Sequence, residues 1–182
     1  TPKPSSAASD VYKRQDQITV GAGANQIIGA ALTASLEPGD EVIVCAPYWV
    51  SYPDMVLLND AKPVVVTGPE SQGFKLDAAT LEAAITPRTR WLILNSPSNP
   101  SGAVYSAAEL RALTDVLLRH PQVWILSDEI YAPFCYSGQS HASPVQVEPQ
   151  LIPRTLIVNG MSKSYAMTGW RIGYGAGPGD LI

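Results

Sequence analysis

The chain has 182 residues, of which 46% are hydrophobic and 15% are charged. This composition is typical of a soluble globular domain rather than a disordered chain, and about 70% of the unfolded surface can be buried at this length. The formal net charge is −4 and the 12 Lys and Arg residues are scattered, so we expect no nucleic-acid partner. No apolar run reaches the roughly 18–20 residues of a membrane span, and the N-terminus has no apolar signal region, so we expect neither membrane association nor secretion.

The two cysteines favour a reducing compartment. Cys45 and Cys135 lie far apart in the sequence, each within an apolar run. We therefore expect two buried, reduced thiols rather than a disulfide, and a cytoplasmic location.

Residues 1–15, TPKPSSAASDVYKRQ, are polar and lack periodicity. We expect this segment to be disordered. The string SSAASDVYKRQ also resembles translated sequencing-adapter read-through, so a native and a non-native origin both stay open, and we attach no function to the segment. The folded domain is expected over residues 16–182.

From residue 17 onward, short apolar runs alternate with helical patterns. Strands are expected at 17–20, 41–46, 62–67, 90–95, 123–128, 155–160 and 171–177, and helices at 24–36, 50–58, 77–85 and 106–119. Most of these strands are apolar throughout, which is typical of strands that are buried on both faces of a parallel sheet. The predicted fold class is α/β: a mostly parallel seven-stranded sheet with helices on both faces.

Two local patterns predict where helices begin and end. Ser106 and Glu109 have the spacing of a capping box, which satisfies two amide groups at the start of the last helix. The sequence Glu-Pro-Gly-Asp at 37–40 predicts a turn that ends the first helix and leads into a strand.

Ligands of open parallel sheets bind just beyond the carboxyl ends of the strands. In this chain those ends are followed by GAGANQ, PYW, NSPSNPSG, DEIY and MSKSYAMTGWR. Together these loops supply an anion-binding turn, an aromatic ring, an amide, a carboxylate, a phenol, a lysine and an arginine. A single site built from them would suit a cofactor that carries several kinds of functional group.

Each of these features has an ordinary interpretation when taken alone. The turn at 21–25 either binds a phosphate at a helix N-terminus or simply connects two elements, and the full GxGxxG spacing is absent. Asp128 is either a buried carboxylate that is paired with a cation or an N–H donor, or a residue that caps a helix. Lys163 is either a desolvated amine that can form an imine or a surface lysine, and Arg171 either binds two phosphate oxygens or forms an ion pair at a strand edge.

Taken together, the loops resemble those of the fold-type I, class I pyridoxal-phosphate aminotransferases. NSPSNPSG is similar to the family's Asn-Pro-x-Asn-Pro-Thr-Gly loop, DEIY to its Asp-Glu-x-Tyr turn, and SKSYAMTGWRIGY to its Schiff-base segment. The strings ITVGAGANQ, LEPGDEVIV and PYWVSYP resemble the family as well. The resemblance therefore runs from about Asp16 to the last residue, and it is strongest to the prokaryotic aspartate aminotransferase subgroup.

The resemblance implies a role for each residue around the cofactor ring. Lys163 would form the Schiff base with pyridoxal 5′-phosphate and move the proton between substrate and cofactor. Asp128 would pair with the pyridine nitrogen and keep it protonated. Asn99 and Tyr131 would hydrogen-bond the phenolate oxygen, and Trp49 would lie against the ring face. Trp49 and Asn99 would also contact the substrate.

The resemblance also implies a phosphate site and no metal ligand. The backbone amides of Gly23, Ala24 and Asn25 would hold the phosphate, with Arg171 as its counter-charge and Ser162 as a further contact. The sequence departs from the family at three positions: Ser101 replaces a threonine, Asn25 stands where the subgroup often has lysine, and Gly160 stands where other subgroups have a phosphate-binding serine.

Family chains are about twice this length, so the chain is expected to be part of the large cofactor-binding domain, without the N-terminal arm and the small domain.

The resemblance implies an aminotransferase that moves an amino group from an L-amino acid to a 2-oxo acid, with aspartate as the expected amino acid. The full-length parent would be a homodimer and the isolated fragment would be inactive. Two alternatives remain: another fold-type I enzyme of this cofactor, such as a lyase or decarboxylase, and a cofactor-binding sensor domain of a transcription regulator.

Overall fold

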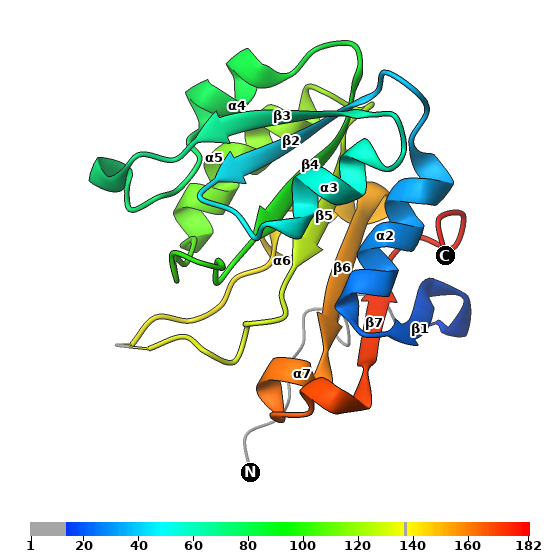
Figure 1. Cartoon of the computed structure of the whole chain (residues 1–182). Helices are drawn as coiled ribbons and strands as arrows, with labels where there is room; N and C mark the ends of the chain where they lie inside the picture. The colour runs from blue at the N-terminus through cyan, green and yellow to red at the C-terminus, as the bar shows by residue number, and fades with distance from the viewer. Residues whose placement is uncertain (1–13, 137) are drawn as a thin grey trace.

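A computed structural model describes residues 14–136 and 138–182 (Figure 1). One mixed sheet runs through the molecule, with strands in the spatial order β1-β7-β6-β5-β4-β2-β3. The strands are β1 (Ile18–Ala22), β2 (Glu41–Ala46), β3 (Lys62–Thr67), β4 (Thr89–Asn95), β5 (Trp124–Asp128), β6 (Thr155–Gly160) and β7 (Ile172–Ala176). β2 to β6 pair in parallel, whereas β7 is antiparallel to both of its neighbours, β1 and β6. The expectation of a mostly parallel seven-stranded sheet is confirmed.

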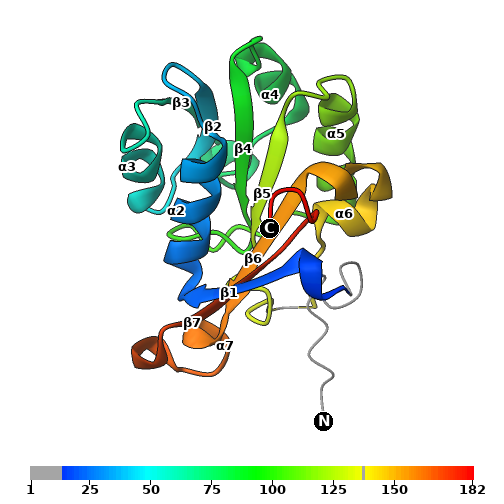
Figure 2. The same cartoon turned by 90° about the vertical axis from the view of Figure 1, so that its right-hand side faces the viewer.

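Helices cover both faces of the sheet. α2 (Ala24–Ser35) and α3 (Ser51–Leu57) lie on one face, and α4 (Ala78–Ala84), α5 (Ala107–Leu118) and α6 (Pro144–Val147) lie on the other (Figures 1 and 2). The short α7 (Met161–Ser164) follows β6. Four 3₁₀ turns complete the list: η1 (Gln15–Gln17), η2 (Glu70–Gln72), η3 (Pro149–Arg154) and η4 (Thr168–Trp170). All four predicted helices are present, each one or two residues shorter than expected.

The continuous apolar runs of the central strands fill two cores at once. Successive side chains on a strand point to opposite faces, so Trp91 and Ile93 of β4 pack with α2 and α3 while Leu92 of β4 packs with α4 and α5. The first core also contains Leu32 of α2, and the second contains Leu113 of α5. Burial on both faces explains why these strands show no polar alternation.

The two predicted local patterns are present. Ser106 and Glu109 form the reciprocal capping box at the start of α5, with Ser106 N donating to Glu109 Oε2 at 2.8 Å. The turn at 37–40 closes with Asp40 N donating to Glu37 O at 3.0 Å, and Gly39 takes the positive φ of 86° that the turn requires. These local contacts mark the start of α5 and the turn that leads from α2 into β2.

Several details differ from the sequence expectations. β1 continues to Ala22, so Gly21 and Ala22 are strand residues and only Gly23 separates β1 from α2. The connection between β5 and β6 contains α6 and η3, which the sequence did not predict because prolines at 144, 149 and 153 interrupt the helical pattern. Residues 1–13 of the segment expected to be disordered lie outside the described residues, and η1 begins at Gln15.

Cys45 and Cys135 are both free thiols, as expected, but they are half-buried rather than fully buried. Burial raises the pKa of the Cys45 thiol. Within the described ranges, none of the helices is long and apolar enough to span a bilayer.

Candidate active site

A cleft of about 240 Å³ opens at the carboxyl ends of the parallel strands. The predicted site residues that line it are Ala24, Asn25, Trp49, Asn99, Asp128, Tyr131, Ser162, Lys163 and Arg171. Further lining residues are Ile28, Tyr52, Asn95, Ile130 and Thr168. The structure therefore brings together every predicted site residue except Gly23, which lies immediately beside the cleft.

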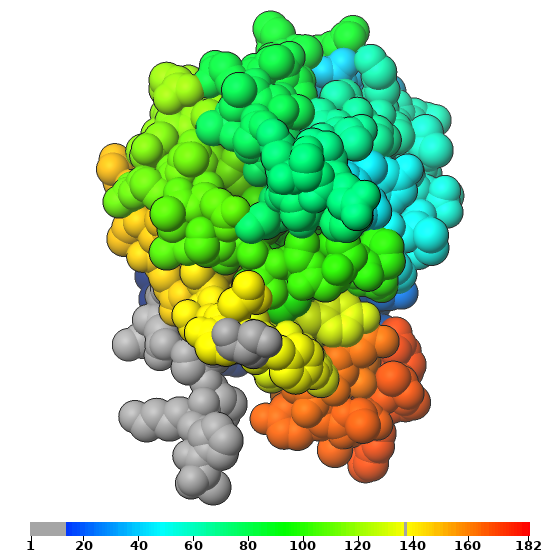
Figure 3. Space-filling model, turned by 90° about the vertical axis from the view of Figure 1, so that its left-hand side faces the viewer, coloured from blue at the N-terminus to red at the C-terminus, as the bar shows by residue number. Residues whose placement is uncertain are grey.

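The sheet topology explains this convergence. β1, β2, β4, β5 and β6 all point toward one edge of the sheet, so the residues that follow them meet there. β7 runs the other way, so Arg171, which precedes it, lies at the same edge. In the space-filling view the orange segment around α7 protrudes from the body of the molecule at this end (Figure 3).

Asp128, the last residue of β5, is buried, with only 5% of its surface exposed. Tyr52 Oη donates to its Oδ2 at 2.6 Å, and the backbone amide of Ile130 donates to its Oδ1 at 3.2 Å. Burial raises the pKa of Asp128 to about 6, the two hydrogen bonds oppose this rise, and the neighbouring Glu129 adds to it. No described cation pairs with this carboxylate, which therefore faces the cleft with neutral donors only.

The asparagine loop after β4 is fixed to the end of β5. Asn95 Nδ2 donates to the backbone oxygen of Asp128 at 3.0 Å, and Asn95 Oδ1 accepts from the amide of Asn99 at 2.8 Å. The first asparagine of the loop thus orients the second one. The side chain of Asn99 is left free to face a ligand in the cleft.

Aromatic rings line another part of the cleft. Trp49 packs edge-to-face on Tyr52, with ring centroids 5.3 Å apart. Lys163 Nζ lies 5.9 Å from the centroid of the Tyr131 ring. Lys163 is otherwise exposed, so the described residues do not supply the desolvated surroundings considered from the sequence. They do place its amine at the cleft, beside the phenol.

The turn between β1 and α2 lies beside Arg171. The amides of Ala24 and Asn25, in the first turn of α2, donate to no acceptor within the described residues, whereas Gly23 N donates to Gly21 O at 2.8 Å. Gly23 contributes space instead, because a Cβ atom at this residue would lie 2.4 Å from Arg171 Nη2. Exposed amides at a helix N-terminus beside a guanidinium are suited to a phosphate-sized anion.

Arg171 is oriented by backbone oxygens rather than by an acid. Its Nη1 donates to Thr168 O at 3.1 Å and its Nη2 donates to Ala22 O at 3.3 Å. No described carboxylate pairs with it, so the alternative of an ordinary ion pair at a strand edge finds no support. The charge of the guanidinium remains available to a ligand.

Sequence reasoning missed Tyr52 and Asn95 as site residues. Tyr52 follows Trp49 by three residues in PYWVSYP; Trp49 precedes α3 and Tyr52 lies in its first turn, where the two rings are in contact. Asn95 is the first asparagine of NSPSNPSG, and only the described fold shows that it bridges Asp128 and Asn99. Ile28, Ile130 and Thr168 carried no signal in the sequence.

The fold and this cleft define a member of a large enzyme family, and comparison with known proteins identifies it. The family model "Aminotransferase class I and II" matches residues 6–182, and the chain belongs to this family. The chain is 55% identical to an aspartate aminotransferase of Rhizobium meliloti (strain 1021) over 100% of its length and 46% of that protein. It is 60% identical to an aspartate/prephenate aminotransferase of Cereibacter sphaeroides over 91% of its length and 42% of that protein.

Solved structures agree with the described fold. The crystal structure of the Rhizobium meliloti aspartate aminotransferase superposes with a TM-score of 0.92 at 59% identity, covering 93% of this chain and 42% of that one. An aspartate aminotransferase double mutant from Thermus thermophilus gives a TM-score of 0.86 at 45% identity, with 91% and 42% covered. The chain thus spans less than half the length of the relatives that it matches.

Proposed function

We propose that residues 16–182 form part of the large domain of an aminotransferase that uses pyridoxal 5′-phosphate. The proposed reaction moves an amino group from an L-amino acid to a 2-oxo acid. The observation that carries this proposal is the convergence of three groups on one cleft: the buried carboxylate of Asp128, the amine of Lys163, and the guanidinium of Arg171 beside free helix amides.

The residues of the cleft fit this cofactor. A buried carboxylate with no cationic partner is costly, and a protonated ring nitrogen would supply the missing positive charge at Asp128. The unpaired guanidinium of Arg171 and the amides of Ala24 and Asn25 match a phosphate dianion. The chemistry of the donor set therefore agrees with a ligand that is basic at one end and anionic at the other.

When bound, pyridoxal phosphate supplies an aldehyde that condenses with amines and a ring that takes up electrons from the substrate α-carbon. Lys163 would provide the amine for attachment, and its Nζ would take and return the proton at the α-carbon. Asp128 would keep a proton on the ring nitrogen. Tyr131 and Asn99 would offer a hydroxyl and an amide to the ring oxygen, and Trp49 would limit tilting of the ring and exclude water from one face.

We propose aspartate as the first amino acid to test, because relatives of 55% and 60% identity are named aspartate or aspartate/prephenate aminotransferases.

We also propose that the full-length parent is a homodimer in the cytoplasm. Trp170 is 70% exposed and Tyr165 is 55% exposed, and large aromatic side chains in such positions are enriched at protein interfaces. The two free thiols are consistent with a reducing compartment.

The test is retention of the cofactor. The purified chain is mixed with pyridoxal phosphate, desalted, and scanned in the visible range, with pyridoxal, which lacks the phosphate, as the matched ligand control. We expect a visible absorbance band that survives desalting with pyridoxal phosphate and is much weaker with pyridoxal. A folded chain that retains neither ligand, or both equally, would contradict the proposed site.

A further inference from the structure

Asn95 connects two residues of the cleft that come from different strands. It is half-buried at the end of β4 and lies opposite Asp128 in the parallel register of β4 and β5. Its Nδ2 donates to the backbone oxygen of Asp128 at 3.0 Å, and its Oδ1 accepts from the backbone amide of Asn99 at 2.8 Å. The family resemblance implied a role for the second asparagine of this loop but none for Asn95.

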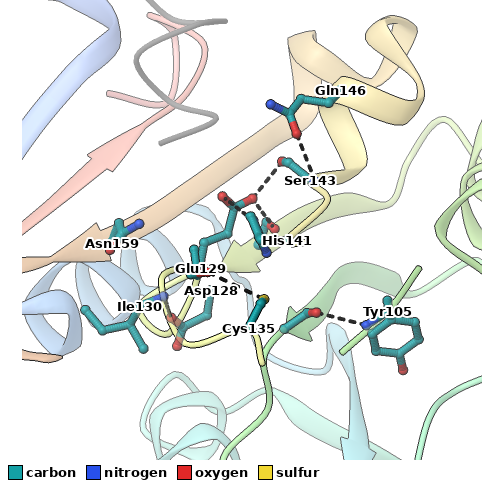
Figure 4. Close-up of polar contacts among 12 residues, drawn as sticks. Tyr105, Asp128, Glu129, Ile130, Cys135, His141, Ser143, Gln146 and Asn159 are labelled. Atoms are coloured by element: carbon teal, nitrogen blue, oxygen red, sulfur yellow. Dashed lines mark hydrogen bonds and ion pairs between the residues drawn. The ribbon is translucent and has the colours of Figure 1, made fainter. Parts of the chain in front are cut away.

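The end of β5 is a firm anchor for this contact. The backbone oxygen of Asp128 also accepts from Ser96 N at 3.3 Å, and Ser96 Oγ accepts from the backbone amide of Tyr105 at 3.1 Å (Figure 4). The carboxylate of Asp128 has other donors. Asn95 therefore bonds to the backbone of β5, and the carboxylate remains available to a ligand.

Asn99 depends on Asn95 for its position. Within the described chain, Asn95 Oδ1 is the one acceptor of the Asn99 backbone amide, and the side-chain amide of Asn99 has no hydrogen-bond partner. Asn99 lines the cleft after the chain has left the sheet. The contact with Asn95 therefore sets where the side-chain amide of Asn99 enters the cleft.

The two hydrogen bonds require a donor and an acceptor on one short side chain. Asparagine carries both on Cγ, whereas aspartate lacks the donor and glutamine is longer by one methylene group. A cavity of about 20 Å³, which is enough for one water molecule, adjoins Asn95 and Tyr52. Packing alone therefore does not fix the Asn95 side chain, and its two hydrogen bonds decide its orientation.

We propose that Asn95 is a positioning residue of the cleft, which sets the placement of the Asn99 amide relative to Asp128. This inference rests on the proposed function for the identity of the ligand, because Asp128 would meet the ring nitrogen of pyridoxal phosphate and Asn99 its ring oxygen. Both atoms belong to one rigid ring, so the two protein groups must be correctly spaced for both contacts to form together.

The first measurement uses the 182-residue chain without cofactor. Solvent exchange of the Asn99 backbone amide is followed by NMR in the wild type, Asn95→Asp and Asn95→Leu. Asn95→Asp keeps an oxygen acceptor, so the amide should stay protected. Asn95→Leu has a similar volume but no acceptor, so exchange should become at least about fivefold faster. An unchanged exchange rate in Asn95→Leu would overturn the proposal.

The matched control is Asn59→Leu. Asn59 is also half-buried, and its Nδ2 donates to a backbone oxygen, that of Met55, at 2.8 Å, but it does not line the cleft. This variant should leave exchange at Asn99 unchanged. If Asn95→Leu does not fold, Asn95→Ala takes its place, and the same outcomes decide.

The second measurement is a double-mutant cycle on the affinity for pyridoxal phosphate. Asn95→Leu should weaken binding by about tenfold in the wild-type background and by less than about twofold in the Asn99→Ala background. Asn59→Leu should leave the affinity unchanged in both. A tenfold loss from Asn95→Leu in both backgrounds would overturn the proposal, because Asn95 would then act independently of Asn99.

The two measurements separate this inference from the proposed function. A wild-type chain that binds no pyridoxal phosphate, but whose Asn99 amide exchanges faster in Asn95→Leu, would support the positioning contact and reject the cofactor site. Binding of pyridoxal phosphate by a chain whose Asn99 amide does not respond to Asn95→Leu would do the reverse.

Discussion

The hydroxyl of Tyr52 donates a hydrogen bond to Oδ2 of Asp128 at 2.6 Å, and both residues are at most 5% exposed. Tyr52 lies in α3 and Asp128 ends β5, so this contact ties a helix on one face of the sheet to the floor of the cleft. Burial raises the pKa of the Tyr52 hydroxyl well above its usual value, so the phenol remains a donor at any physiological pH. The pair fixes the carboxylate that the proposed function places against the cofactor ring.

Replacing Tyr52 with Phe should destabilise the chain by about 1–3 kcal/mol at about pH 8, because it leaves a buried carboxylate without its strongest donor. The loss should be smaller at about pH 5, where Asp128 is mostly protonated, since the hydrogen bond favours the ionised form. Urea unfolding at both pH values measures the difference. The matched control is Tyr48→Phe, whose hydroxyl has no hydrogen-bond partner among the described residues; equal losses in the two variants would contradict the assigned role.

Asp128 should make the cofactor-free chain less stable as pH rises. Its pKa is raised from 3.8 to about 6, so the folded state binds the proton more tightly than the unfolded state between these values. Stability from this site is therefore fully present below about pH 4 and is lost as pH rises through 6, by at most about 3 kcal/mol. Asp128→Asn should remove this loss, so the variant should gain stability relative to wild type as pH increases from about 4 to 8. A stability difference that is constant over this range would refute the raised pKa.

Gly23→Ala should disrupt the anion site. The added Cβ would lie 2.4 Å from Arg171 Nη2, and the residue has a φ of 84°, which favours glycine. We expect pyridoxal phosphate affinity to fall by at least about tenfold, which corresponds to roughly 1.4 kcal/mol. Gly29→Ala is the control, because nothing lies within 4 Å of its Cβ position in α2, and it should be neutral or stabilising by about 0.5–1 kcal/mol. Equal affinity in both variants would exclude a role for the Gly23 and Arg171 contact.

Much of the fold was predictable because the apolar composition of the core strands indicates that they are buried. EVIVCA is apolar after its first residue and RWLILN is apolar between its ends, and these apolar stretches are buried on both faces of the sheet. The reversed direction of β7 was not predictable, because RIGYGAG has no feature that depends on strand direction. In the structure β7 packs closely against the start of α2: a Cβ at Gly173 would lie 2.3 Å from the amide nitrogen of Ala24.

The residues that line the cleft were predictable where they belong to a recognisable loop motif, as Lys163 and Asp128 do. Contacts between segments that are distant in the sequence were not predictable. The reach of Tyr52 to Asp128 and the closure of His141 onto Glu129 depend on how α3 and the segment before α6 pack against the end of β5. Such contacts are set by tertiary structure, and single residues give little sign of them.

The isolated chain should show no transaminase turnover. The described residues that line the cleft include only two cations, Lys163 and Arg171, and the proposed function uses both for the cofactor. None remains to bind the α-carboxylate of an amino acid. The assay follows oxaloacetate formed from aspartate and 2-oxoglutarate, with pyridoxal phosphate in excess. Turnover by the chain alone would show that the described cleft already holds a complete substrate site.

Covalent labelling tests the central claim most directly. The chain is incubated with pyridoxal phosphate, reduced with borohydride, and mapped by peptide mass spectrometry, in parallel with Lys163→Ala and with Lys62→Ala as a control for an exposed lysine. The account predicts one dominant pyridoxyl label on Lys163 in the wild type and in Lys62→Ala, and its loss in Lys163→Ala with an unchanged circular dichroism spectrum. A label spread over surface lysines, or one that persists at wild-type level in Lys163→Ala, would contradict it.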